Sequence, residues 1–280
     1  HFKSSGKDNW GLVRVAIDII RKEREAGRIV TADQYPYTAS STSLAATFIP
    51  SWARAGGTKK MLERLESGPE TARIHTAIQS KLKATEQGQR VQIARYRPAP
   101  DWAGRRLKEI ADEKHVAPFD LILQILKSDS GTKIVNFSMN EDDVRYVMQQ
   151  PWVATASDGS AKIPSEEFPH PRNYGTFPRK IGHSSVREGV VPLTHAIRSS
   201  TGLPAEILGL KDRGYLRVGL KADIAVWGEQ ELIDKAKFDA PHQYGEGIRY
   251  LLVNGTLTIW NGKLTGALAG RALRHKPTSR

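Results

Sequence analysis

Residues 28–42 read RIVTADQYPYTASST, which we interpret as a short strand running into a loop rich in phenol and hydroxyl side chains. Leu12 to Ala26, before it, carries apolar residues at helical spacing among charges, and Gly27 follows as a stop signal. This segment therefore has the order helix, short connection, strand (Arg28 to Asp33), polar loop. That order is typical of an α/β barrel or a doubly wound sheet. The expected fold class is therefore α/β.

The same alternation of strands and helices is predicted later in the chain. Lys133 to Phe137 is a strand candidate, and a helix to about Gln149 follows it, with Asn140 as its N-cap and acids in its first turn. Val153 to Ala156 is a short apolar strand that ends at Ser157-Asp158-Gly159. A carboxylate at the C-terminal end of a buried strand stands where barrel enzymes keep catalytic groups.

The segment between these two regions differs in character. Ser51 to Lys127 is mostly helical and charged, and Pro98-Ala99-Pro100 interrupts it before further helical runs at 103–114 and 119–127. We interpret it as a helical insertion (about 51–127) packed beside the α/β part.

The last part of the chain is predicted to hold a small β domain. A Pro- and Gly-rich loop extends from Gly159 to about Gly189, and short helices follow over 192–208. Residues 215–227 and 248–264 are β-rich, and Asn-Gly pairs at 254–255 and 261–262 are strong hairpin signals. We therefore divide the chain into an α/β part (1–210) and a small β part with a basic tail (211–280).

Composition limits the partners that the chain is expected to have. The 280 residues hold 39% hydrophobic residues, enough for a sizeable core, but no cysteine and no apolar run long enough to span a bilayer. The formal charge of +12 is spread among acids, apart from the tail residues Arg271, Arg274, His275, Lys276 and Arg280. A dispersed positive field favours solubility or anionic small substrates, so neither nucleic acid nor membrane is expected as a partner.

Four clusters carry residue types suited to chemistry. His1-Phe2-Lys3 offers a metal-binding type of side chain beside a cation, and Tyr35 to Thr42 offers phenols and hydroxyls for a polar ligand. Ser157-Asp158-Gly159 offers a carboxylate, and the run from His170 to Arg179 offers Arg172 for a bidentate carboxylate contact. Each cluster, taken alone, is equally compatible with an ordinary structural role.

Other candidate sites are weaker. The chain has no phosphate-binding glycine loop and no G-x-S-x-G nucleophile elbow. Five scattered histidines lack metal-ligand spacing and are expected to be structural or exposed: His75, His115, His195, His242 and His275.

The joint order of the clusters resembles the D-aminoacylase branch of the amidohydrolase superfamily. The similar stretches are His1-Phe2-Lys3, Asp33 to Tyr37 with Ser41-Thr42, Ala156 to Gly159, and His170 to Arg179, with a further match over 214–226. The resemblance covers essentially the whole chain and is weakest in the helical insertion. It implies the C-terminal part of a distorted (β/α)8 metal-dependent hydrolase barrel, plus a small β-sandwich domain.

The resemblance also implies roles for six residues. His1 corresponds to a zinc ligand, and Asp158 to the catalytic acid/base, also at the metal. Lys3, Tyr35, Ser41 and Arg172 correspond to the groups that bind the carboxylate of the substrate. The implied reaction is zinc-dependent hydrolysis of N-acyl-D-amino acids to a carboxylic acid and a free D-amino acid.

The chain departs from the family in what it lacks. Phe2 stands where the family usually has a second histidine, and the remaining metal ligands, a cysteine among them, have no counterpart here. We therefore expect this chain to be a C-terminal fragment whose N-terminal part, of roughly two hundred residues in a barrel of ordinary size, completes the site. The fragment alone is expected to be inactive.

Two other functions stay open at this stage. One is a cyclic-amide hydrolase of the hydantoinase or dihydroorotase type, and the other is a metal-free barrel that acts as a binding protein. The carboxylate-binding set favours an open N-acyl amino acid as the small-molecule partner. No residue determines the compartment, and a cytoplasmic location is favoured.

Overall fold

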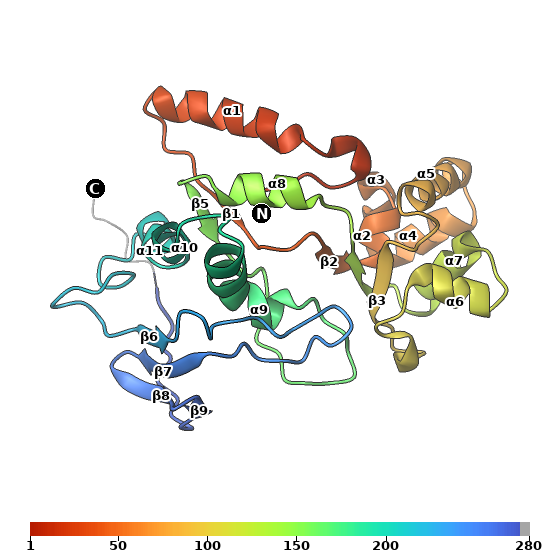
Figure 1. Cartoon of the computed structure of the whole chain (residues 1–280). Coiled ribbons are helices and arrows are strands. Elements are labelled where there is room, and N and C mark those ends of the chain that lie inside the picture. Colours follow the sequence, from red (N-terminus) through yellow and green to blue (C-terminus); the bar gives the residue numbers. More distant parts are fainter. Residues whose placement is uncertain (275–280) are drawn as a thin grey trace.

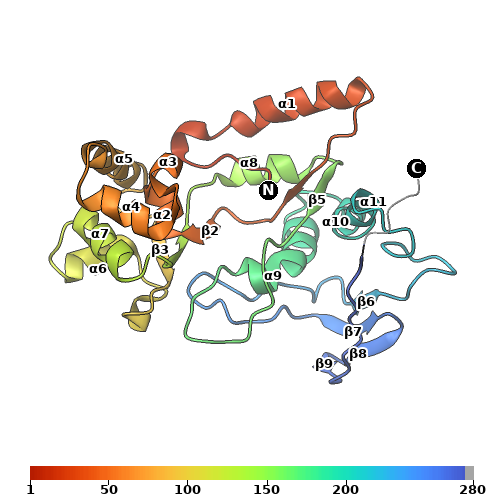
Figure 2. The ribbon, with the colours of Figure 1, turned by 180° about the vertical axis from the view of Figure 1, so that it is seen from behind.

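The chain folds into three parts. A computed structural model describes residues 1–274. A short parallel strand pair covered by helices lies in the centre, a helical lobe extends to one side, and an antiparallel sheet lies near the C-terminus (Figure 1). The view from behind shows the same separation of the helical lobe from the other two parts (Figure 2).

The central strands bring the two halves of the sequence together. β1 (Ala32–Gln34) and β5 (Val153–Thr155) are parallel, with Ala32 opposite Val153. Alternate backbone groups of β1 point to opposite sides. The Gln34 carbonyl accepts from Ala156 N (3.0 Å), and the Asp33 carbonyl accepts from Phe2 N (2.7 Å). The N-terminal segment, β1 and β5 therefore lie side by side.

Helices cover this centre as their apolar faces dictate. α1 (Leu12–Glu25) packs beside α8 (Glu141–Met148), and both bury residues against β5 in a cluster made of Val13, Ile17, Val147, Trp152 and Val153. The Asn140 side chain accepts from the backbone N–H groups of Asp142 and Asp143, which confirms the predicted N-cap. The later helices that contact β5 are α10 (Leu193–Ser200) and α11 (Gly202–Ile207).

The helical lobe has its own core. Its helices are α2 (Leu44–Phe48), α3 (Ser51–Arg54), α4 (Gly57–Glu66), α5 (Thr71–Ala84), α6 (Leu107–Glu113) and α7 (Pro118–Ser128). Its antiparallel sheet has the order β2 (Ser40–Ser43), β4 (Lys133–Asn136), β3 (Val91–Arg95). Ile74, Ile78 and Leu82 recur at every fourth position of α5 and are at most 1% exposed, as their spacing predicts.

The predicted limits of the lobe need correction. The lobe begins at β2 rather than at Ser51, and it contains β3, which the helical interpretation of 51–127 missed. The predicted strand at 133–137 is confirmed as β4, but it pairs antiparallel with β2 and β3 instead of continuing the parallel pair. β2 consists of Ser and Thr without apolar alternation, so only tertiary pairing reveals it as a strand.

The predicted loop after Asp158 is partly helical. α9 (Arg172–Pro178) continues into a wide π-helical segment, Arg179–Arg187. Pro171 and Pro178 suggested a stiff loop, but Pro171 is the N-cap of α9 and Pro178 is its last residue. A proline at the start of a helix loses no hydrogen bond, so Pro171 is compatible with a helix that begins at Arg172.

The C-terminal sheet follows its turn signals. β6 (Ile224–Trp227), β7 (Ile248–Val253), β8 (Thr256–Trp260) and β9 (Lys263–Leu264) form one antiparallel sheet in that order. Both predicted Asn-Gly hairpins are confirmed, with positive φ at Asn254, Gly255, Asn261 and Gly262, as type I′ turns require. The strand predicted from Tyr215 begins only at Ile224. His275, Lys276 and Arg280 of the predicted tail lie outside the described residues.

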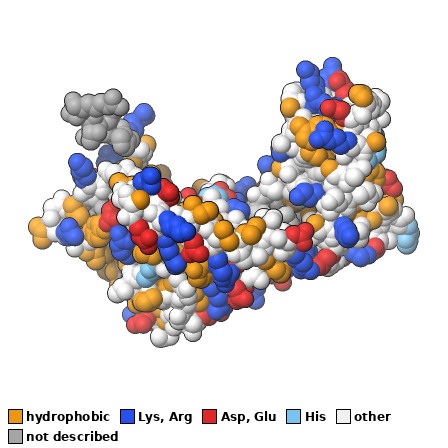
Figure 3. All heavy atoms as spheres, turned by 90° about the horizontal axis from the view of Figure 1, so that it is seen from above, with side chains coloured by type: hydrophobic (Ala, Val, Ile, Leu, Met, Phe, Trp, Pro, Cys, Tyr) orange, Lys and Arg blue, Asp and Glu red, His pale blue; other side chains and the backbone are white. Residues whose placement is uncertain are grey.

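Charge is dispersed over one face of the molecule. On the face seen in Figure 3, Lys and Arg side chains are interspersed with acidic and apolar ones rather than gathered into one field. Among residues 1–274, no helix has the length and apolar character needed to cross a bilayer.

Candidate active site

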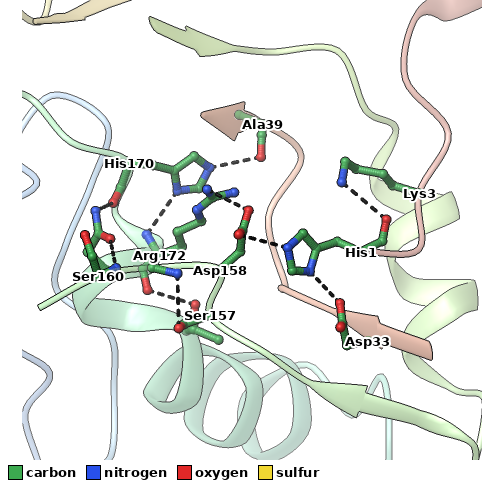
Figure 4. Close-up of polar contacts among 12 residues, drawn as sticks. His1, Lys3, Asp33, Ala39, Ser157, Asp158, Ser160, His170 and Arg172 are labelled. Carbon is green, nitrogen blue, oxygen red and sulfur yellow. Dashed lines mark hydrogen bonds and ion pairs between the residues drawn. The ribbon is translucent and has the colours of Figure 1, made fainter. Parts of the chain in front are cut away.

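The functional candidates meet where the central strands end. Tyr35 follows β1 directly, and Asp158 lies three residues beyond the end of β5. His1 and Lys3 come from the segment that pairs with β1, and Arg172 opens α9. Figure 4 shows His1 and Arg172 on opposite sides of the Asp158 carboxylate.

Asp158 is held by both of its oxygens. His1 Nε2 lies 2.9 Å from Oδ1, and Arg172 Nη2 lies 2.7 Å from Oδ2. The backbone of Asp158 is in the left-handed region, with φ of +46°. Non-glycine residues adopt this conformation rarely, and those that do are concentrated at functional sites. The turn fixes the direction in which this carboxylate points.

Gly159 lets α9 approach the turn. A Cβ placed at Gly159 would lie 2.9 Å from Asn173 Oδ1 and 3.0 Å from Asn173 Cα. The Asn173 side chain in turn accepts from Ser160 N at 2.9 Å. The glycine predicted to permit a tight loop therefore permits close packing of the turn on α9.

His1 lies between two carboxylates. Its Nδ1 contacts Asp33 Oδ1, while its Nε2 faces Asp158. A carboxylate on one ring nitrogen fixes the orientation of an imidazole whose other nitrogen binds a ligand. Asp33 is a residue to which sequence reasoning gave no role, and its position within β1, two residues before Tyr35, was the signal that could have found it.

A cationic and aromatic group surrounds Asp158. The Arg172 guanidinium lies 4.7 Å from the Tyr35 ring centroid, and Lys3 Nζ lies 5.3 Å from the same centroid. Burial lowers the pKa of the Lys3 ammonium, and it raises the pKa of the Tyr35 phenol, which is therefore a neutral donor at neutral pH.

Two donors in this group have no partner. Tyr35 Oη and Arg172 Nη1 are buried, and neither makes a hydrogen bond within residues 1–274. Tyr35 is 2% exposed and Arg172 is 7% exposed. Because an unsatisfied buried donor is costly, these two atoms mark a place prepared for an acceptor from a ligand.

The predicted substrate-binding residues line one cavity. It has a volume of about 420 Å³, and its lining includes Lys3, Tyr35, Ser41, Asp158 and Arg172. Ser41 reaches it from β2 of the helical lobe, where it lies opposite Val135 of β4. The volume is in the range of small-molecule sites.

His170 supports this site from behind. It is 1% exposed, its Nε2 donates to the Ala39 carbonyl (2.9 Å), and its Nδ1 accepts from Arg172 N (3.0 Å). Burial, together with the Arg172 charge, lowers the pKa of His170 to about 3, so its ring is neutral. The sequence placed His170 in the right cluster but gave no indication that it positions Arg172.

The residues present match a zinc site in type but not in number. A histidine nitrogen and an aspartate oxygen that face each other are donors of the kind that zinc binds. Within the described part of the chain, however, no group of three or more His, Cys, Asp or Glu side chains is placed to hold a metal ion. A zinc site that includes His1 and Asp158 therefore needs further ligands.

An α/β chain in which a histidine, an aspartate and two cations gather beside the ends of its central strands has an organisation compatible with a metal-dependent hydrolase. Comparison with known proteins makes the class specific. The chain belongs to the amidohydrolase family, whose model matches residues 47–259.

Its relatives within the family are deacylases. The chain is 31% identical to the D-aminoacylase of Alcaligenes xylosoxydans xylosoxydans, over 98% of this chain and 47% of that protein. It is 30% identical to the N-acyl-D-glutamate deacylase of the same organism, over 91% and 43%. The chain therefore spans about half the length of the curated relatives it matches.

Solved structures of deacylases also match this chain over about half of their own length. The crystal structure of D-aminoacylase that defines a novel subset of amidohydrolases matches with a TM-score of 0.76 and 30% identity, over 98% of this chain and 49% of that one. D-aminoacylase has also been described with a binuclear metal center. The N-acyl-D-glutamate deacylase of Bordetella bronchiseptica, complexed with zinc and a phosphonate inhibitor, matches with a TM-score of 0.71 and 27% identity, over 96% and 49%.

Proposed function

We propose that the complete protein hydrolyses the amide bond of N-acyl-D-amino acids in a zinc-dependent reaction, releasing a carboxylic acid and a D-amino acid. The observation that carries the proposal is the pair of buried, unpartnered donors, Tyr35 Oη and Arg172 Nη1, beside Asp158 in one cavity. The names of the similar deacylases supply the D configuration and the open amide.

The α-carboxylate of the substrate is bound by the cations of this cavity. Arg172 donates through Nη1, because its Nη2 already holds Asp158, and Lys3 supplies a second charge. Tyr35 and Ser41 add neutral donors. Binding at several fixed points holds the scissile amide in one orientation relative to Asp158.

Asp158 moves the proton. It takes the proton from the attacking water and then delivers it to the nitrogen of the departing amine. Arg172 Nη2 holds Oδ2 of this carboxylate in place for the transfer. Bound zinc, for which His1 and Asp158 are ligands of suitable type, would lower the pKa of that water and polarise the amide carbonyl.

The domain architecture is part of the proposal. Residues 1–210, with the helical lobe inserted, form the C-terminal portion of a (β/α)8 barrel, and residues 211–280 comprise a portion of a β-sandwich and the basic tail. The parallel pair of β1 and β5, with the N-terminal segment hydrogen-bonded to β1, supports the first assignment, and the β6–β9 sheet supports the second.

The test is release of amino acids from paired N-acetyl-D- and N-acetyl-L-amino acids. The protein is expressed from its complete reading frame and loaded with zinc. We expect release from the D series, and we expect a chelator to abolish it. Hydrolysis of hydantoins in its place would assign a cyclic-amide hydrolase, and a protein that retains no zinc and releases nothing would be a binding protein.

A further inference from the structure

The cavity holds more positive charge than one carboxylate requires. Its lining includes five cations but only one acid, Asp158. Lys3 and Arg172 serve the α-carboxylate in the proposed function. The remaining three cations, which we call the basic wall, are Lys7, Lys81 and Arg90.

Only one carboxylate within the described residues balances the basic wall. Lys7 Nζ lies 2.6 Å from Glu86 Oε1, and Arg90 Nε lies 2.9 Å from the same oxygen. The hydrogen bond from Lys7, together with the adjacent Arg90 guanidinium, lowers the pKa of Glu86, which is therefore an anion at neutral pH. Three cations and one anion leave a net charge of +2 at this wall.

Lys81 has no acidic partner among residues 1–274, since none of the ion pairs formed there includes it. It lies in the last turn of α5, where Thr85 donates a hydrogen bond to its carbonyl. Residues four apart share one face of a helix, and both Lys81 and Thr85 line the cavity. The end of α5 thus presents a free cation and a hydroxyl residue to the ligand space.

We propose that the basic wall binds a second carboxylate, so that the preferred substrates are dianionic N-acyl-D-amino acids. This inference rests on the proposed function. A cavity with surplus positive charge attracts anions and pairs poorly with neutral groups of the same shape. The second carboxylate belongs either to an acidic side chain or to a dicarboxylic acyl group, and both present the same chemistry to the wall.

The substrate test compares three compounds in the zinc-loaded protein from the complete reading frame. N-acetyl-D-glutamate carries the second carboxylate on the side chain, N-succinyl-D-glutamine carries it on the acyl group, and N-acetyl-D-glutamine lacks it. We expect kcat/KM for one dianion to exceed that for N-acetyl-D-glutamine by about tenfold or more, the effect of one charged hydrogen bond. The favoured dianion identifies the source of the carboxylate.

The failures of the two proposals are distinguishable. Hydrolysis of N-acetyl-D-glutamine with no preference for either dianion overturns the basic wall and leaves the proposed function intact. Hydrolysis of none of the three compounds removes both.

A variant pair tests the residues. Lys81→Gln is expected to lower the ratio of kcat/KM for the favoured dianion to that for N-acetyl-D-glutamine by about tenfold. Lys83→Gln, an exposed lysine of the same helix outside the cavity lining, is the matched control and should keep the ratio. Because both rates come from one sample, the ratio does not depend on the folded fraction. An unchanged ratio in both Lys81→Gln and Lys7→Gln would refute the assignment.

Discussion

Replacing Tyr35 by Phe separates stability from substrate binding. The Tyr35 hydroxyl is buried, and no group in residues 1–274 bonds to it. An unsatisfied buried hydroxyl costs about 1–3 kcal/mol. Tyr35→Phe is therefore expected to raise the free energy of unfolding by about 1 kcal/mol, since part of that cost is removed.

The same substitution should weaken substrate binding. The hydroxyl is proposed to donate to the substrate carboxylate, and a neutral hydrogen bond contributes about 0.5–1.5 kcal/mol, so KM should rise roughly twofold to tenfold. Tyr37→Phe is the matched control. The Tyr37 hydroxyl is also buried without a partner among the described residues, but Tyr37 does not line the cavity. The Tyr37→Phe variant should therefore be more stable than the unmodified protein and have the same KM.

The assays are urea denaturation and steady-state kinetics on an N-acetyl-D-amino acid. A loss of more than about 1 kcal/mol in Tyr35→Phe would mean that the hydroxyl has an internal partner after all. An unchanged KM would mean that it does not meet the substrate.

Three further predictions concern Asp158, Arg172 and His170. Asp158→Asn should lower kcat about 10²- to 10⁴-fold while substrate affinity, measured by equilibrium binding, persists; unchanged turnover would remove Asp158 from the proton transfer. Arg172→Ala should raise KM by about tenfold or more, and an effect confined to kcat would contradict its anchoring role. Because the pKa of His170 is lowered in the fold to about 3, its contribution to stability is fully present above the unfolded pKa of about 6.5 and is lost as pH falls towards 3. Over that window His170→Gln should flatten the pH dependence of the unfolding free energy by up to about 1.4 kcal/mol per unit; an identical slope in the variant would mean that His170 is protonated in the fold.

Strand ends, together with the family resemblance, led sequence reasoning to this candidate site. Tyr35 and Asp158 follow short strands, His1 was identified from the resemblance, and the structure brings all six predicted residues to one place. The catalytic and ligand roles assigned to them stay predictions.

What the sequence could not supply depends on distant contacts. The pairing of β2 with β4 joins a Ser/Thr strand to residues ninety or more positions away, since Ser43 lies opposite Lys133 and Ser40 opposite Asn136. Asp33 has its role because it contacts His1, and His170 has its role because it contacts Arg172. Neither contact could be predicted from the residues next to it in the sequence. Prolines at both ends of α9 concealed a helix that tertiary packing supports.

The insertion of the helical lobe between β1 and β5 has a kinetic consequence. Ala32 and Val153 are paired across 121 positions of the chain, which makes their meeting slow unless the intervening segment is already compact. The lobe has a core of its own, so it can collapse early. Its collapse shortens the flexible loop that must close before β1 and β5 pair. We therefore expect pulse-labelling hydrogen exchange to protect the amides of α5 and α7 before those of β5, so that the strand ends beside the candidate active site acquire their geometry last.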